Sequence, residues 1–305
     1  MKKIVALVAT VLAVAILFMS CAGSASRTAD GVGAVAVDST SVSGDEIQRI
    51  LADAGATAGV AVICGDDTVT VGNDDVYPLM SVFKLHIAVA ILRGHTPLDS
   101  VVHVGAGQLR ENTYSPLRDK SGGKDIDITV DRLMWYSVVK SDNNACDLLI
   151  DIAGGIQAVD SVVQCLHLGN VKLTETEDSM HADIMRSYNN CSSPLALATL
   201  MSRLYNGDIL DEDGTVYLTG LLNESTTGRE KLAAGIPAEH FLGHKSGLSD
   251  RTPAGMLIAS GDVAAFSTAG GRTAFVAVLV KDNNSADSCI NRIFADVAMT
   301  VFKTK

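Results

Sequence analysis

The sequence predicts an α+β fold, in which an all-α lobe interrupts an α/β sandwich with an antiparallel sheet. Valine-rich runs typical of strands lie near both ends of the chain, within 57–71 and 256–281. The stretch between them, about 81–223, is mostly helical or loop-like. We therefore expect a sheet built from distant segments, with a cleft between it and the helical lobe.

The first α/β segment is predicted at about 44–80. It opens with an amphipathic helix at 45–54, where acids in the first turn precede apolar residues at helical spacing. Val-rich strands at 57–64 and 68–71 follow, and the Gly-Asp-Asp turn between them indicates a hairpin.

The lobe begins with an apolar helix at 81–93, which Gly94 ends, and its clearer later helices lie at 133–152 and 194–205. The second α/β segment, about 224–305, comprises strands at 256–260, 263–267 and 275–281 and a closing amphipathic helix at 285–302. The two segments and the lobe together form one predicted domain at 44–305.

The N-terminal residues are predicted to direct export. A positive start, a short uncharged apolar run and small residues after it are typical of a secretory signal peptide, here 1–20. The run is too short to span a bilayer comfortably. The residues before Cys21 resemble a bacterial lipobox, which implies lipidation of Cys21 and an anchor facing the periplasm or the cell exterior. An ordinary signal cleavage nearby is the alternative, and 21–43 reads as a flexible tether.

The composition supports a globular domain and excludes some partners. Apolar residues make up 47% of the 305 residues, which is ample for a core. The net charge is −11, and removal of 1–20 takes away Lys2 and Lys3 and no acid, which leaves −13. This acidic balance argues against nucleic acid or an anionic membrane surface as partner. We expect a monomer.

Ser81 and Lys84 form the first of three short motifs that carry chemistry. They are three residues apart, so one helical turn places both side chains on one face. A serine hydroxyl is a poor nucleophile until a neighbouring base removes its proton, and a partly desolvated lysine beside another cation can be that base. The alternative for the pair alone is a helix-capping serine with a surface lysine.

The second motif is Ser141-Asp142-Asn143, before an apolar helix. In a catalytic interpretation Ser141 passes a proton to the leaving group, Asp142 is structural, and Asn143 holds an amide carbonyl of the substrate. Taken alone, the three residues are equally well explained as a helix-capping cluster.

The third motif is Lys245-Ser246-Gly247, at the start of strand-like sequence. Glycine there lets a substrate backbone approach the strand edge. We expect Lys245 to hold the Ser141 hydroxyl and attract a carboxylate, and Ser246 to hydrogen-bond that carboxylate. In isolation this tripeptide has no specificity.

In this order, with 60 residues from Ser81 to Ser141 and 104 from Ser141 to Lys245, the motifs resemble those of the serine penicillin-recognising enzymes. By spacing the chain is most similar to a class A β-lactamase, over about 45–305, and Tyr114 matches an aromatic residue at the pocket mouth. The resemblance implies a β-lactamase/transpeptidase-like fold. It also implies hydrolysis of penicillin- and cephalosporin-type antibiotics through an acyl-serine, antibiotic resistance, and no metal or organic cofactor.

The base that releases the acyl group distinguishes a β-lactamase from its acylating relatives. The segment Thr174–His181 lies where the family carries a glutamate loop, and it resembles the branch that reads Glu-x-x-Met-His. That resemblance implies Glu177 as the base and His181 as the residue that holds the water. Glu175 is the competing candidate, and a solvated acidic loop is the non-catalytic alternative.

Recognition of the substrate carboxylate departs from the common pattern. Many relatives use an arginine on the strand after the third motif, where this sequence has Ala254. In the Glu-x-x-Met-His branch, an arginine earlier in the sequence binds the substrate carboxylate. Lys231 lies at that position in this sequence, and Arg229 is the alternative. A zinc pair at His240 and His244 is not expected, because the intervening sequence is strand-like.

Several points stay open from the sequence. The resemblance implies an oxyanion hole from the backbone N–H groups of Ser81 and Leu248, but either Lys84 or a water on Glu177 fits as the acylation base. Two other functions also remain: a penicillin-binding D,D-peptidase, and a catalytically silent surface lipoprotein of the same fold.

Overall fold

The computed structural model describes residues 41–305. The predicted signal peptide, the lipidation site Cys21 and most of the predicted tether lie outside these residues. No helix within 41–305 combines the length and apolar character needed to cross a bilayer.

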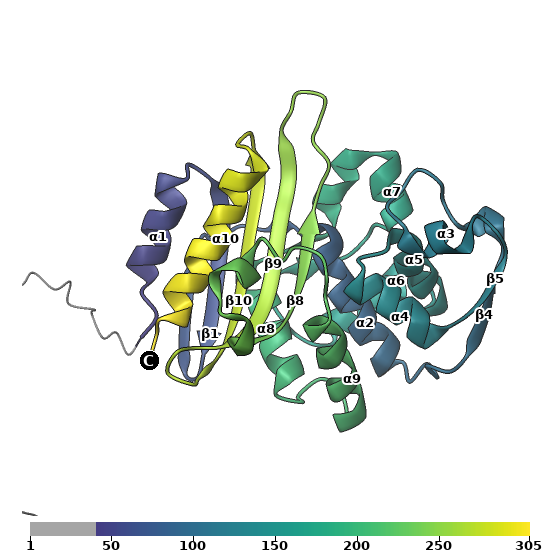
Figure 1. The fold of residues 1–305 in the computed structure, drawn as a ribbon, viewed down its shortest axis with the longest axis horizontal. Coiled ribbons are helices and arrows are strands. Elements are labelled where there is room, and N and C mark those ends of the chain that lie inside the picture. Colours follow the sequence, from purple (N-terminus) through teal and green to yellow (C-terminus); the bar gives the residue numbers. More distant parts are fainter. Residues whose placement is uncertain (1–40) are drawn as a thin grey trace, which may run out of the picture. The chain divides into compact units, whose positions relative to one another are not determined.

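A five-stranded antiparallel sheet forms the α/β part, in the order β2-β1-β10-β9-β8 (Figure 1). Its strands are β1 (Thr57–Cys64), β2 (Asp67–Val71), β8 (Phe241–Leu248), β9 (Leu257–Ser267) and β10 (Thr273–Asn283). Strand β1 pairs along its whole length with β10, more than 200 residues later in the chain. The predicted sheet of distant segments is therefore confirmed.

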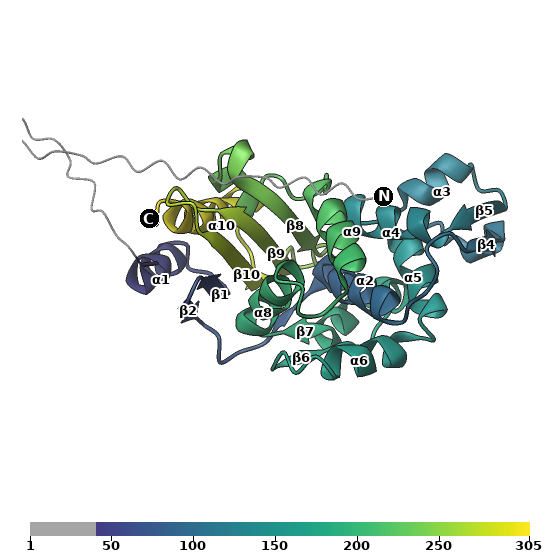
Figure 2. The same cartoon turned by 90° about the horizontal axis from the view of Figure 1, so that it is seen from below.

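Both faces of the sheet are buried, because alternate residues of its central strand enter different cores. Val276, Val278 and Val280 of β10 pack under α1 (Gly44–Asp53) and α10 (Asp287–Phe302). The intervening residues of β10 pack against α8 (Pro194–Tyr205) on the other side, in a core that also contains α2 (Lys84–Arg93). Figure 2 shows α8 beneath the sheet. This explains why β9 and β10 read as nearly continuous apolar runs.

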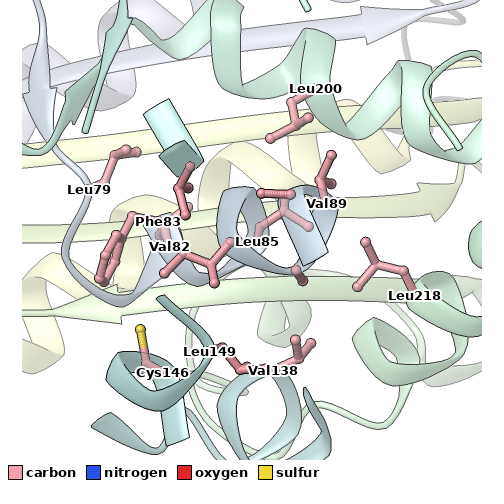
Figure 3. Close-up of a cluster of buried hydrophobic side chains, with 14 of the residues drawn as sticks. Leu79, Val82, Phe83, Leu85, Val89, Val138, Cys146, Leu149, Leu200 and Leu218 are labelled. Atoms are coloured by element: carbon pink, nitrogen blue, oxygen red, sulfur yellow. The ribbon is translucent and has the colours of Figure 1, made fainter. Parts of the chain in front are cut away.

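The second core fills the helical part, and α2 lies at its centre. Figure 3 shows Phe83 of the 3₁₀ helix η1 (Met80–Phe83), with Leu85 and Val89 of α2, among side chains from neighbouring helices. The helices here are α3 (Pro116–Ser121), α4 (Val130–Val139), α5 (Asn143–Ile152), α6 (Ile156–Gln164), α7 (Glu177–Ala182) and α9 (Glu212–Asn223). Short strands β4 (Val101–Val104) with β5 (Ile126–Thr129), and β3 (Tyr77–Pro78) with β7 (Cys191–Ser192) and β6 (Val171–Lys172), complete it.

The main elements agree with the prediction, with two corrections. The single helix expected at 133–152 is two helices, α4 and α5, because Ser141 adopts a left-handed backbone (φ 56°) and Asp142 caps the second helix. The strands expected at 256–260 and 263–267 are one strand, β9. Gly261 marks close packing there rather than a turn, since a Cβ on it would lie 2.9 Å from Leu279.

Helix α8 lies within the predicted lobe segment, yet it packs on β1 and β10 of the sheet. The division of the chain into an α/β part and a lobe at the stated boundaries stays a prediction.

Candidate active site

Ser81 lies in the 3₁₀ helix η1 (Met80–Phe83), directly before α2. The preceding Met80 has a left-handed backbone (φ 46°), uncommon for a residue with a side chain and frequent near functional sites. Lys84 is the first residue of α2, and its Nζ lies 3.1 Å from Ser81 Oγ. The two residues of the first motif are therefore in direct contact.

The Lys84 ammonium is fully buried and surrounded by oxygen acceptors. Beyond Ser81 it donates to the Ser141 carbonyl (2.7 Å) and to Asn143 Oδ1 (2.6 Å), and it lies 2.9 Å from Glu177 Oε1. One side chain thus connects the first motif, the second motif and the acidic loop.

Lys245 approaches the same group from the sheet. Its buried Nζ donates to Ser141 Oγ and to the Ser246 carbonyl, both at 2.9 Å. Burial and the nearby Lys84 charge lower the pKa of Lys245 to about 7, from an ordinary value of 10.5. Ser141 therefore contacts one lysine through its carbonyl and another through its hydroxyl.

The other residues of the second motif have different surroundings. Asp142 is fully buried, and its pKa is raised by burial. It accepts hydrogen bonds from the Ser115 hydroxyl and from the N–H groups of Leu117 and Ala145. Asn143 borders the cleft and donates from Nδ2 to Thr113 Oγ1 at 2.8 Å.

Glu177 is the first residue of α7, and its Oε1 lies 3.5 Å from Ser81 Oγ. Asp147, on α5, accepts the N–H groups of Glu177 and Asp178, each at 2.8 Å, and so fixes the start of α7. Burial and the Glu177 charge raise the pKa of Asp147 to about 7. The sequence interpretation missed Asp147; its position four residues after Asn143 on one helix was the available signal.

Glu175, the competing base, is engaged elsewhere. Its carboxylate accepts hydrogen bonds from Ser179 Oγ (2.6 Å), Asn189 Nδ2 (2.8 Å) and Arg186 (3.2 Å). These contacts belong to the loop itself, and Glu175 does not border the cleft. The geometry thus favours Glu177 over Glu175 as the acid nearest the serine.

A cleft of about 730 Å³ opens above these groups. It is bordered by Ser81, Ser141, Asn143 and Glu177, by Tyr114 and His181 at its rim, and by the segment 226–231 and β8 on the opposite side. Tyr114 and Leu248 are half exposed at its mouth. Lys84 and Lys245 lie buried beneath it.

The third motif lies near the end of β8 rather than at the start of a strand as expected, and it forms the edge of the cleft. A Cβ on Gly247 would lie 2.6 Å from the Leu79 carbonyl and 2.9 Å from Ser81 N, so only glycine permits this approach. Ser246 Oγ donates to the Thr227 carbonyl at 3.1 Å.

Lys231 borders the cleft with little of its surface exposed, and its ammonium turns inward. Nζ donates to the carbonyls of Gly247 (2.5 Å) and Gly261 (3.2 Å), and burial lowers its pKa to about 8. Arg229 is held outside the cleft by the Ser225 carbonyl and by Phe241, whose ring centroid lies 4.8 Å from its guanidinium carbon.

Ala254 requires a correction. It lies in the exposed turn between β8 and β9 rather than on the strand after the third motif. The β9 residue directly across from Ser246 is Asp262. The turn between β8 and β9 is longer than the motif spacing suggested. Ala254 was therefore placed on the next strand although it lies in the turn.

His240 and His244, the pair considered for zinc, lie in different surroundings. His244 is buried on β8 against Asp262, whereas His240 packs its ring against Phe302. Within residues 41–305, no three His, Cys, Asp or Glu side chains gather as a metal site would require.

Comparisons with known proteins match this architecture. A model described as "Beta-lactamase enzyme family" matches residues 43–304. A β-lactamase of Bacteroides uniformis is 36% identical, over 85% of this chain and 89% of that protein. The extended-spectrum β-lactamase PER-1 of Pseudomonas aeruginosa is 32% identical, over 85% and 86%. The crystal structure of a class A β-lactamase from Bacteroides cellulosilyticus DSM 14838 superposes with a TM-score of 0.80 at 36% identity, covering 85% of this chain and 97% of that one.

Proposed function

This chain belongs to the β-lactamase enzyme family, among the class A serine enzymes, and we propose that it opens the β-lactam ring of penicillin- and cephalosporin-type antibiotics through an ester on Ser81. Such an activity confers resistance to these antibiotics. The observation that carries the proposal is the contact of Glu177 with both Lys84 and Ser81, because it joins an acylating pair to a group able to hydrolyse the ester.

In the acylation step, Ser81 Oγ attacks the lactam carbonyl carbon and loses its proton to Lys84 or to a water on Glu177. The developing oxyanion accepts hydrogen bonds from the backbone N–H groups of Ser81 and Leu248. The close approach of Gly247 to Ser81 N supports this arrangement. When the lactam C–N bond breaks, Ser141 gives its proton to the departing nitrogen, and the proton taken from Ser81 replaces it on Ser141.

In the deacylation step, Glu177 removes a proton from a water that attacks the ester carbonyl, and the ester C–O bond breaks as that proton passes to Ser81 Oγ. His181, on the cleft side of α7, helps to hold that water. The position of Glu177 near the serine supports this role.

Substrate binding uses the rim and the sheet edge. Asn143 holds an amide carbonyl, Tyr114 packs against the substrate at the mouth, and Gly247 lets it lie along β8. Ser246, with the charge of Lys245 beneath, holds the carboxylate. Lys231 adds positive charge from below rather than by direct contact, since its ammonium already donates to two carbonyls.

Nitrocefin turnover by the purified domain 44–305 tests the proposal. We expect many turnovers per molecule. A D,D-peptidase would instead stop after one turnover, with a persistent acyl adduct on Ser81. A silent binding protein would form no adduct. Mass spectrometry of the protein after the reaction therefore distinguishes the three functions. Ser81→Ala is the matched control and must abolish both turnover and adduct.

We also propose that the enzyme is exported, lipid-anchored through Cys21 and monomeric. The predicted signal peptide and lipobox support the first two properties. Mass spectrometry of the membrane fraction should find diacylglycerol on Cys21, and Cys21→Ser should release the protein. Light scattering should give the mass of one chain.

A further inference from the structure

The face of β8 opposite Lys245 carries a buried acid–imidazole pair that the reaction described above does not use. His244 Nδ1 lies 3.0 and 3.2 Å from the two carboxylate oxygens of Asp262, and both side chains are fully buried. His244 Nε2 has no hydrogen-bond partner among the described residues. Neither side chain borders the cleft.

Asp262 joins three elements behind the cleft. It belongs to β9, it contacts β8 through His244, and it accepts the N–H group of Leu232 at 3.2 Å. Leu232 opens the 3₁₀ helix η4 (Leu232–Gly235) and directly follows the wall segment 226–231. Asp262 therefore holds the wall of the cleft against the sheet.

Asp262 also supplies negative charge to two buried lysines. In the pairing of β8 with β9, Asp262 lies directly across from Ser246, the residue after Lys245. Of the carboxylates that favour the charged form of Lys245, Asp262 has the largest effect, ahead of Glu177. It likewise has the largest such effect on Lys231, ahead of Glu230 and Asp287. The opposing influences on Lys245 are burial and the Lys84 charge. His244 is the remaining titratable group packed on the carboxylate.

We propose that Asp262 is a positioning residue for catalysis: its buried carboxylate keeps Lys245 positively charged from the rear face of β8, and thereby sets how strongly the cleft attracts an anionic substrate. This inference rests on the proposed function, because it assigns Lys245 the part of attracting the substrate carboxylate. Asp262 itself does not touch the substrate.

The direction of the effect follows from the position of Lys245. Its pKa is about 7, so a small change in local potential alters its charge at neutral pH. Loss of the Asp262 charge lowers that pKa further and leaves less charged Lys245 at any given pH. The alkaline limb of kcat/KM then moves to lower pH.

Asp262→Asn is the test, because asparagine keeps the shape and an oxygen for the Leu232 N–H but removes the charge. We expect the alkaline limb of the kcat/KM profile for nitrocefin to move down by about one pH unit. The decrease in kcat/KM should come from a higher KM more than from a lower kcat. For a cephalosporin whose carboxylate is methylated, the effect of the variant on KM should be absent, because that substrate carries no charge for Lys245 to attract.

Two companion variants separate charge from structure. His244→Asn retains the Asp262 charge and should leave the alkaline limb in place. Asp262→Ser, a smaller uncharged side chain, repeats the test if the asparagine variant does not fold. An unmoved limb in folded Asp262→Asn or Asp262→Ser, or an equal shift in His244→Asn, overturns the inference. Absence of turnover by the wild type would instead overturn the proposed function.

Discussion

Lys84 and Glu177 form a buried ion pair: Nζ lies 2.9 Å from Oε1, and the two side chains are 0% and 8% exposed. The same ammonium contacts Ser81 Oγ at 3.1 Å. Lys84 therefore contacts both the proposed nucleophile, Ser81, and the proposed base for ester hydrolysis, Glu177. Removing either member of such a pair leaves the other charge buried and poorly compensated.

Glu177→Gln should separate the two halves of the reaction. Glutamine keeps the shape but is not a base, so the ester on Ser81 should accumulate and turnover should fall by roughly 10²–10⁴-fold. Mass spectrometry after mixing with a penicillin should show the adduct at Ser81. Turnover equal to the wild type would exclude Glu177 as the base.

The matched control for this prediction is Glu175→Gln. Glu175 lies in the same loop but bonds to Ser179, Asn189 and Arg186 rather than to the cleft. We expect Glu175→Gln to lower the melting temperature while leaving no persistent adduct. A persistent adduct in Glu175→Gln, together with normal turnover in Glu177→Gln, would instead identify Glu175 as the base.

Gly247→Ala should disable the enzyme through the backbone. The added methyl group would lie 2.6 Å from the Leu79 carbonyl and 2.9 Å from Ser81 N, so β8 must move away from the serine. A displacement near 1 Å at a reacting centre costs about 100-fold in kcat/KM. Gly107→Ala is the control, since a Cβ there has no atom within 4 Å. Nitrocefin kinetics with both variants measure the difference.

Asp142→Ala should cost stability. Asp142 accepts hydrogen bonds from the Ser115 hydroxyl and from the N–H groups of Leu117 and Ala145, all in the interior. Leaving these donors without a partner should lower the free energy of unfolding by about 3 kcal/mol. Urea unfolding followed by circular dichroism measures this, and an unchanged midpoint would contradict the buried capping role.

His86 should make the domain acid-sensitive. It is buried on α2, and burial lowers its pKa to about 4 from 6.5, which outweighs the opposing effect of the Phe83 backbone. The folded state thus binds fewer protons than the unfolded state between these values, so stability falls as the pH drops from 6.5 to 4. The loss at pH 4 should reach roughly 3 kcal/mol.

His86→Leu removes this titration, so its free energy of unfolding should vary less between pH 6.5 and 4 than that of the wild type. His95→Asn is the control: this histidine is exposed, and asparagine tolerates its left-handed backbone (φ 50°). Chemical unfolding at several pH values gives the comparison. Equal slopes for wild type and His86→Leu would refute the prediction.

Local patterns predicted most of the regular elements. The helix at 194–205 and the first hairpin have the predicted bounds within one residue, because caps, turn residues and apolar period all agree there. The break between α4 and α5 was missed, since it depends on the left-handed backbone of Ser141. Tertiary contacts hold that conformation, and the apolar period runs through it.

Contacts in the site could be predicted where both residues lie on one helix or strand. They could not be predicted where the two residues come from different elements. The contact of Ser81 with Lys84 follows from helical spacing. Asp147 and Asp262 were missed because their partners, the start of α7 and His244, come from other elements. The inward turn of Lys231 was equally hidden, because it depends on carbonyls of two strands brought together only by folding.

The central position of β10 has a consequence for biosynthesis. This strand lies between β1 and β9, and it follows β1 in the chain by more than 200 residues. During synthesis, β1 and β2 therefore emerge long before the strand that joins them to the rest of the sheet. Until β10 is made, β1 has no partner toward the middle of the sheet and its apolar side chains have no core to enter, so the sheet cannot form progressively from the N-terminal end.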